Sequence, residues 1–371
     1  MKTQTIVMIC LGLLVLSACT GRGVTGNVPA ETSNEPVTIG AVLPLSGQVA
    51  AYGVSAKNSI ELAVQEANAN GGINGHPIKV IFEDGKCDGK AGADAANKLI
   101  GVDNVPVIIG GVCSSETLSF TSMAEQNKVV VFSPCASAPE YTNAGDYIFR
   151  DYPSDGYAGT LAAQFVEKQF GAKNAAIMYT NDDYGIGVKG AFESAFKRTG
   201  EVESFTKGET DYRTQLARIK NNAPDVIFVV AFTGDAARIA VQAKEMQMNI
   251  PLVFTDSVAK DEFLATAGSV AEGMYVLASE AAYAQSYVDS YNASFHEAPQ
   301  LCGPQSYDIT NILVNTMRKV GTDSTAIKDA LYNVKDYPGV AWNITLDQNG
   351  DLVGAAFKVL RVENGKFVTV E

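Results

Sequence analysis

The sequence predicts an α/β fold made of two lobes, each built around a parallel sheet with helices on its faces. Short β-rich apolar runs alternate with helical segments along the chain, and this order produces parallel sheets covered on both sides. The alternation breaks near residues 150–155 and then starts again. About 350 residues remain after the leader described below, which is too many for one ordinary hydrophobic core.

The first series of elements begins with an apolar strand at 37–43. The helix expected at 54–70 places small and apolar residues on one face, namely Ala56, Ile60, Ala63 and Ala67. Glycines and asparagines at 70–75 then supply a turn, because they tolerate positive φ. The other elements expected in this half are strands at 78–82, 105–109 and 129–132 and helices at 91–100 and 116–126.

The second series repeats the same alternation. Helices are expected at 156–170, 187–198, 212–221 and 235–246, and strands at 175–179, 202–205, 225–230 and 252–254. Beyond residue 280 we expect helices at 283–295, 307–320 and 325–333, followed by strands at 342–346 and 355–362. Two α/β units in tandem are what a hinged cleft requires.

The first 18 residues have the pattern of a signal peptide. Lys2 supplies a positive charge, and the apolar run at 6–16 is too short to span a membrane as a resident helix. The run leads into Leu16-Ser17-Ala18-Cys19, which looks like a lipobox. We therefore expect Cys19 to carry lipid and residues 19–35 to form a flexible tether outside the cytoplasmic membrane. A signal peptide with an incidental cysteine is the alternative.

The composition argues against several functions. The net charge is −13, with no basic run, so nucleic-acid binding is not expected. His76 and His296 lie far apart, with no cysteine pair at metal spacing. A catalytic Cys113 with His76 as its base is conceivable, but no phosphate-binding loop, nucleophile elbow or metalloprotease motif occurs. We expect neither catalysis nor a cofactor.

A set of short motifs follows one another in a characteristic order. The set comprises Ile39-Gly-Ala-Val-Leu-Pro-Leu-Ser-Gly47, Tyr52-Gly53, Asn70-Gly-Gly-Ile-Asn-Gly75, Cys87-Asp88, Cys113-Ser-Ser115, Ser133-Pro-Cys-Ala-Ser-Ala-Pro-Glu140, Asp183-Tyr-Gly185 and Thr255-Asp256. In order and spacing it resembles the type I periplasmic binding proteins of the leucine/isoleucine/valine-binding protein family. The resemblance runs from about Val37 to about Asp308 and more loosely to the end.

The resemblance implies two Rossmann-like lobes joined by a three-stranded hinge. The N-terminal lobe would comprise 36–154 and 282–350, and the C-terminal lobe 155–281 and 351–371. It also implies an ABC importer as partner, with permease subunits that receive an amino acid from a monomeric binding protein. The fold by itself does not determine the ligand, so a sensory receptor domain, or a binder of amides, urea or aromatic acids, stays open.

The resemblance further implies a disulfide between Cys87 and Cys113, which an exported protein can keep, while Cys135 and Cys302 are expected to be free. Ser114 stands where a strand ends and a helix begins, so free N–H groups and the helix dipole favour a ligand carboxylate there. Helix capping is the alternative role for Ser114.

The remaining implied contacts complete an amino-acid site. The Cys135 carbonyl and the Ser137 hydroxyl would accept hydrogen bonds from the α-amino group, and the Ser137 N–H would also serve the carboxylate. Asp256 would pair with the ammonium, because an unpaired buried ammonium is costly. The aromatic residues Tyr52, Tyr184 and Phe232, on loops leaving strands, would enclose the ligand side chain.

Overall fold

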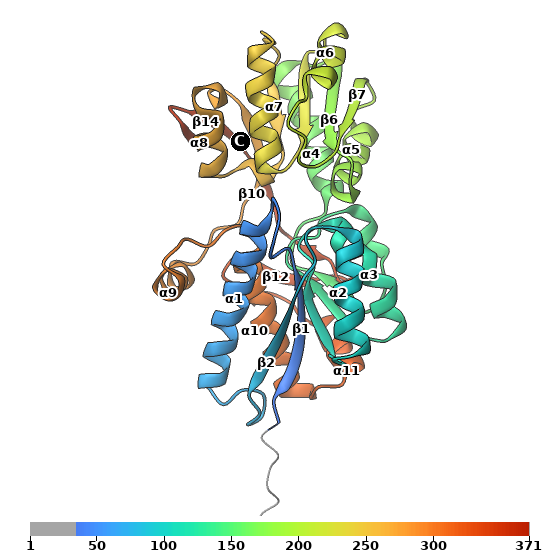
Figure 1. Cartoon of the computed structure of the whole chain (residues 1–371), viewed down its shortest axis with the longest axis vertical. Helices are drawn as coiled ribbons and strands as arrows, with labels where there is room; N and C mark the ends of the chain where they lie inside the picture. Colours follow the sequence, from blue (N-terminus) through green and yellow to red (C-terminus); the bar gives the residue numbers. More distant parts are fainter. Residues whose placement is uncertain (1–34, 371) are drawn as a thin grey trace, which may run out of the picture. The chain divides into compact units, whose positions relative to one another are not determined.

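The computed structural model describes residues 35–370, so the signal peptide and Cys19 lie outside the described residues. Within that range the chain forms two large sheets flanked by helices and a small three-stranded sheet near the end of the chain (Figure 1). The first sheet has the strand order β2-β1-β3-β4-β5. It is built from β1 (Val37–Leu43), α1 (Ala50–Ala69), β2 (Ile78–Asp84), α2 (Gly89–Gly101), β3 (Val107–Gly110), α3 (Ser114–Gln126), β4 (Val130–Ser133), η1 (Pro139–Asn143) and β5 (Ile148–Arg150).

The second sheet has the order β15-β14-β10-β9-β8-β6-β7. Its first part consists of α4 (Asp155–Phe170), β6 (Ala175–Thr180), α5 (Asp183–Ala195), β7 (Thr199–Phe205), α6 (Arg213–Asn221), β8 (Val226–Val230), α7 (Thr233–Glu245), β9 (Leu252–Phe254), η2 (Asp256–Val258), α8 (Asp261–Ala267), η3 (Gly268–Ala271) and β10 (Tyr275–Ser279).

The rest of the chain returns to the first sheet and then to the second. It comprises α9 (Gln285–Phe295), α10 (Gly303–Val320), α11 (Ser324–Leu331), β11 (Tyr337–Pro338), β12 (Asn343–Leu346), β13 (Leu352–Val353), β14 (Phe357–Glu363) and β15 (Lys366–Thr369). We call the first sheet with its helices and α9 to β13 the first lobe. The second sheet with its helices is the second lobe.

The strands are apolar because helices cover both faces of each sheet. All residues of β3, β4 and β8 are buried, as expected for parallel strands between helical layers. The first sheet is parallel throughout. In the second sheet β14 pairs antiparallel with β10, and β15 with β14. The predicted α/β fold class is confirmed, although the second sheet is mixed and not purely parallel.

Three helices begin four residues earlier than the sequence pattern indicates, among them α10 at Gly303. Helix α1 starts at Ala50 and α5 at Asp183. At α5 the Asp182 side chain accepts a hydrogen bond of 3.0 Å from the Gly185 N–H, which is the capping arrangement that starts a helix. Tyr52 and Tyr184 therefore stand in the first turns of helices, not on loops as predicted.

Candidate functional site

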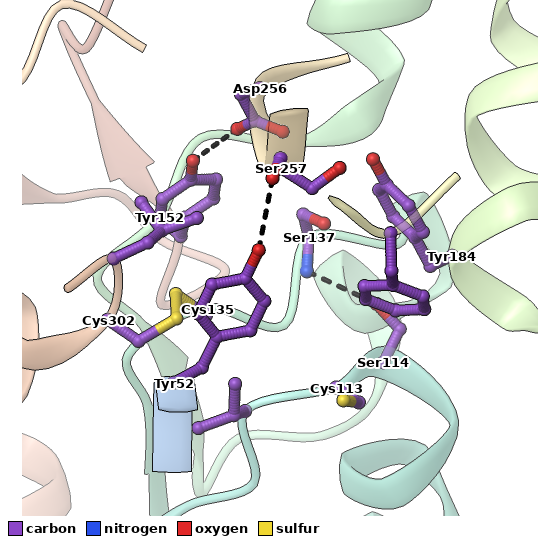
Figure 2. Close-up of a pocket in the computed structure, with 13 residues that line it drawn as sticks. Tyr52, Cys113, Ser114, Cys135, Ser137, Tyr152, Tyr184, Asp256, Ser257 and Cys302 are labelled. Atoms are coloured by element: carbon purple, nitrogen blue, oxygen red, sulfur yellow. Dashed lines mark hydrogen bonds between the residues drawn. A yellow bond between two sulfur atoms is a disulfide. The ribbon is translucent and has the colours of Figure 1, made fainter. Parts of the chain in front are cut away.

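The carboxyl ends of the strands bring the predicted binding residues around one pocket between the lobes. All seven of them line it: Tyr52, Ser114, Cys135, Ser137, Tyr184, Phe232 and Asp256. The other lining residues are Val112, Cys113, Tyr152, Ser257, Leu301 and Cys302. The space not filled by atoms is about 440 Å³, including the opening to solvent. Figure 2 shows these side chains around the pocket.

One side of the pocket is formed by the start of α3. The Ser114 hydroxyl oxygen accepts hydrogen bonds from the Ser137 N–H at 3.3 Å and the Ala138 N–H at 3.2 Å. Its own hydrogen is left to donate into the pocket, beside the first N–H groups of α3, which have no acceptor within the helix. This is a suitable seat for a carboxylate. The Ser137 N–H, which we expected to serve a carboxylate, is directed at Ser114 instead.

Asp256 supplies a negative charge on the other lobe. It lies directly after β9, and its carboxylate accepts a hydrogen bond from the Tyr152 hydroxyl. Burial raises the pKa of Asp256, while the Tyr152 hydrogen bond and backbone N–H groups oppose that shift. No cation is paired with this carboxylate among the ion pairs of residues 35–370. A ligand ammonium would supply the missing counter-charge and favour the ionised form.

Buried carboxyls surround the loop that carries Ser137. Asp155, at the start of α4, is 4% exposed, and its N–H donates to the Ser137 carbonyl at 2.8 Å. Burial, followed by the charge of Asp256, raises the pKa of Asp155, while a hydrogen bond with the Ser137 side chain lowers it. The charge of Arg150 also lowers the pKa of Asp155, and a ligand ammonium near Asp256 would favour the ionised form of both acids.

Glu116 holds two loops of the pocket in place. Its side chain is fully buried, and its oxygens accept hydrogen bonds from Cys87 N at 3.0 Å and Val112 N at 2.9 Å. Gly85 and Gly111 leave room for it, since a Cβ at either position would lie within 2.5 Å of a Glu116 oxygen. Burial raises the pKa of Glu116 to about 7. The sequence does not predict this role. Its only indication is an acidic residue in the first turn of α3, which is buried.

Hydrogen bonds cross the pocket from lobe to lobe. The Tyr52 hydroxyl on α1 lies 3.1 Å from Thr233 Oγ1 and donates to the Ser257 carbonyl at 3.1 Å. The Lys207 amine donates to the Cys87 carbonyl at 2.7 Å. Tyr184 and Phe232 form a tilted aromatic pair with centroids 5.5 Å apart. These contacts close parts of the pocket rim and place aromatic surface around its interior.

The disulfide arrangement corrects part of the sequence analysis. Cys87 and Cys113 are bonded, as the resemblance implies. Cys135 and Cys302, expected to be free, are also bonded, with Cα atoms 5.6 Å apart. They are 167 residues apart in sequence, and only the tertiary fold of the first lobe brings them together. The expectation of free thiols was wrong for this reason.

We predict that the segment 35–371, denatured without reductant, contains no free thiol. Both pairs of cysteines in this segment are bonded, and a denaturant does not break disulfides. Thiol titration with a chromogenic reagent measures this directly, and a sample reduced beforehand shows the full thiol count. Two thiols in the unreduced sample would restore the expectation that Cys135 and Cys302 are free.

Lys260 is a further residue at this rim that sequence reasoning missed. Its amine, on the second lobe, lies 3.2 Å from the centroid of the Tyr52 ring. Burial lowers the pKa of Lys260 from 10.5 to about 7, and the charge of Glu262 only partly offsets this. The folded protein thus binds fewer protons at this residue than the unfolded chain between about pH 7 and 10.5.

We predict that this difference makes the free energy of unfolding rise with pH in that window. Below about pH 7 the lysine is charged in both states, so its burial penalty is then complete and constant. Lys260→Met should remove this contribution to the rise of the free energy of unfolding with pH. Urea unfolding of both proteins at several pH values tests this, and parallel stability curves from pH 7 to 10 would contradict it.

Two α/β lobes with a polar and aromatic pocket between them define the class of two-lobed ligand-binding proteins. The described helices of residues 35–370 include none long and apolar enough to cross a membrane. The same residues contain no group of three or more His, Cys, Asp or Glu placed to hold a metal ion.

The chain belongs to the periplasmic binding protein family, whose model matches residues 36–366. It is 28% identical over 370 residues to the Leu/Ile/Val-binding protein BraC3 of Rhizobium johnstonii, covering 96% of this chain and all of the relative. It is 25% identical to the leucine-, isoleucine-, valine-, threonine- and alanine-binding protein of Pseudomonas aeruginosa, over 91% of this chain and 92% of that protein.

Solved structures agree with this assignment. The branched-chain amino acid transporter substrate-binding protein LivJ of Streptococcus pneumoniae, in complex with isoleucine, is 27% identical. The match covers 91% of this chain and all of that one, with a TM-score of 0.80. The leucine-binding protein LivK of Thermotoga maritima has the same fold, with a TM-score of 0.83 over 90% of this chain at 24% identity. The predicted membership in the type I periplasmic binding proteins is confirmed.

Proposed function

We propose that this protein captures an α-amino acid between its lobes and presents it to an ABC importer. The observation that carries the proposal is the charge arrangement of the pocket. Ser114 and the start of α3 suit a carboxylate, whereas Asp256 on the other lobe has no cation partner among the ion pairs of residues 35–370. One zwitterion would satisfy both groups and join the lobes.

The apolar lining supports an aliphatic side chain on that zwitterion. Tyr52, Val112, Phe232 and Leu301 contribute hydrophobic surface to the pocket. The names of the similar proteins, which include leucine, isoleucine and valine among their ligands, agree with this chemistry. We propose binding and delivery, not catalysis, as the role of the pocket.

A ligand that contacts both lobes stabilises the arrangement in which they meet, because it binds that arrangement better than a separated one. We propose that the lobes move as units close to the expected bounds, 36–154 with 282–350 and 155–281 with 351–371, except that residues 351–353 stay with the first lobe because β13 pairs with β12. Three segments of the described chain connect them, at 151–154, 280–284 and 354–356. The ligand-bound arrangement is what permease subunits would recognise.

A ligand screen tests the proposed function. We expect one or a few aliphatic L-amino acids to raise the melting temperature, since binding to the folded state alone stabilises it. The screen uses the twenty amino acids, with urea, simple amides and benzoate as controls, and calorimetry then gives the affinity. Binding only of compounds without an amine would defeat the amino-acid proposal and leave the binding-protein fold intact.

We also propose that Cys19 is the lipidated N-terminus, which would hold the protein at the outer side of the cytoplasmic membrane. Cys19→Ala is expected to give protein that is unprocessed or released from membranes, because the modified residue is absent. Fractionation and mass spectrometry of the wild type and the variant measure this. A mature wild-type protein with an unmodified Cys19 would contradict the proposal.

A further inference from the structure

The Cys135–Cys302 disulfide forms part of the wall of the pocket. Both residues line it, and Cys135 is partly exposed whereas Cys302 is 1% exposed. Figure 2 draws the disulfide on the side of Tyr52 and Tyr152, away from Ser114 and Tyr184. The sulfur atoms thus lie away from the part of the pocket that suits a carboxylate. An aliphatic side chain of the ligand would lie next to them.

The Cys135 end of this wall is held firmly. The Ser133 hydroxyl donates to the Gly111 carbonyl at 2.6 Å, while its oxygen accepts the N–H groups of Cys135 at 3.3 Å and Ala136 at 2.8 Å. Two further N–H groups of the same loop are held by Ser114. The loop therefore has little freedom to move away from a larger ligand.

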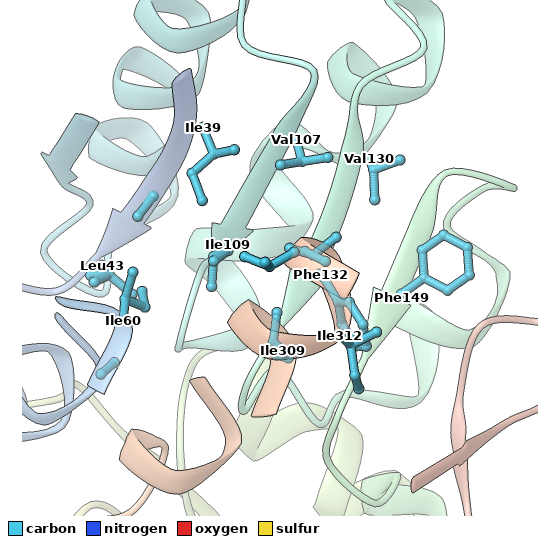
Figure 3. Packing of buried hydrophobic residues seen from close by; sticks show 14 of the residues in the cluster. Ile39, Leu43, Ile60, Val107, Ile109, Val130, Phe132, Phe149, Ile309 and Ile312 are labelled. Carbon is cyan, nitrogen blue, oxygen red and sulfur yellow. The ribbon is translucent and has the colours of Figure 1, made fainter. Parts of the chain in front are cut away.

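The Cys302 end is held by the core of the first lobe. Cys302 precedes α10, and its carbonyl accepts the Ser306 N–H at 3.1 Å and hydroxyl at 2.7 Å. Ile309 and Ile312 of α10 pack in the same buried cluster as Ile109 and Phe132 of the sheet (Figure 3). The helix also lies close against α1, since a Cβ at Gly303 would meet Ser55 Oγ at 2.4 Å.

We propose that the Cys135–Cys302 disulfide limits the size of the ligand side chain, an inference that rests on the proposed function. A covalent bond between a tied loop and a core helix cannot swing aside as a single side chain could. Its two sulfur atoms occupy space beside Leu301 and Tyr52. The pocket then accepts side chains of about the size of valine and excludes aromatic rings such as that of phenylalanine.

The test compares affinities for L-valine and L-phenylalanine by calorimetry on the purified chain. In the wild type, we expect phenylalanine to bind at least about tenfold more weakly than valine, as expected for a pocket that is too small by a few carbon atoms. Equal affinities would overturn the proposal without any variant. In Cys135→Ala/Cys302→Gly, the ratio of the phenylalanine to the valine dissociation constant should fall about tenfold, because space is opened.

A matched variant distinguishes the effect of the added pocket volume from the effect of losing the disulfide. Cys135→Val/Cys302→Ala removes the same bond but restores two methyl groups near the position of the Cys135 sulfur and the Cβ atom at 302. Glycine and alanine are chosen at 302 because its φ is +73°, which disfavours branched side chains. The melting temperatures of both variants measure how much stability is lost with the disulfide.

The outcomes are distinguishable. The proposal is supported if the ratio of the phenylalanine to the valine dissociation constant falls in Cys135→Ala/Cys302→Gly but not in Cys135→Val/Cys302→Ala. An unchanged ratio with valine binding retained, or an equal change in both variants, overturns the size-limiting role. Absence of binding of every amino acid to the wild type would instead defeat the proposed function, and the inference would fall with it.

Discussion

Replacing Asp256 with alanine is expected to weaken amino-acid binding by about two to three orders of magnitude. The ligand ammonium would then lie in a pocket with no carboxylate directly opposite it, and an uncompensated buried charge costs about 3–5 kcal/mol. The Tyr152 hydroxyl, which donates to Asp256, would also lose its acceptor. Calorimetry with the best ligand from the screen measures the effect.

Asp261→Ala is the matched control for this experiment. Asp261 is an exposed acid at the start of α8 in the same lobe, so its removal changes the net charge equally without touching the pocket. We expect its affinity to stay near the wild-type value. Equal affinities of the wild type and Asp256→Ala would remove Asp256 from the site, whereas equal weakening by both substitutions would point to a general charge effect.

Replacing Arg150 with methionine is expected to lower the free energy of unfolding by about 3–5 kcal/mol. The Arg150 side chain is fully buried. It donates to the carbonyls of Ser137 and Ala138, both at 3.0 Å, and to Asp351 Oδ2 at 2.8 Å. Methionine keeps the apolar stem but leaves the partly buried Asp351 carboxylate without its cation, which is the costly part of the change. The Ser137 and Ala138 carbonyls lose one of their two donors and keep the N–H groups of Asp155 and Tyr141.

Urea unfolding of wild type and Arg150→Met measures this loss, with Arg198→Met as the control. Arg198 pairs with Glu167 at 2.6 Å, but both side chains are more than half exposed. Removing such a pair costs about 0–1 kcal/mol. A loss for Arg150→Met no larger than that for Arg198→Met would contradict the structural role of Arg150. Because Arg150 holds the Ser137 loop, weaker ligand binding should accompany the loss of stability.

Local sequence patterns were sufficient for the fold class and for most elements. Strands such as β4 and β8 are continuous apolar runs, since both faces of the sheet are covered, and this signal is carried by the strand itself. Short elements were missed, among them β5 and β10. Strand β5 has three residues and ends in Arg150, whose burial depends on a partner 201 residues away.

The position of the candidate site followed mainly from the family resemblance, and it agrees with the rule that binding residues gather where parallel strands end. The same reasoning could not find Tyr152, which lies in the break between lobes and had no periodic pattern. Its contact with Asp256 joins residues 104 positions apart. The signal that could have found it is a tyrosine within a short connection between two predicted lobes.

The amino-acid sequence, with the family resemblance of its motifs, determined the two-lobed α/β class, most of the strands and helices and seven of the residues that line the pocket. These depend on local periodicity, on caps and on motif order. Only the tertiary structure decided the Cys135–Cys302 bond, the placement of Lys260 over Tyr52 and the burial of Arg150. Each of these joins segments distant in the chain, and its energy depends on packing, desolvation and distance, which no local pattern encodes.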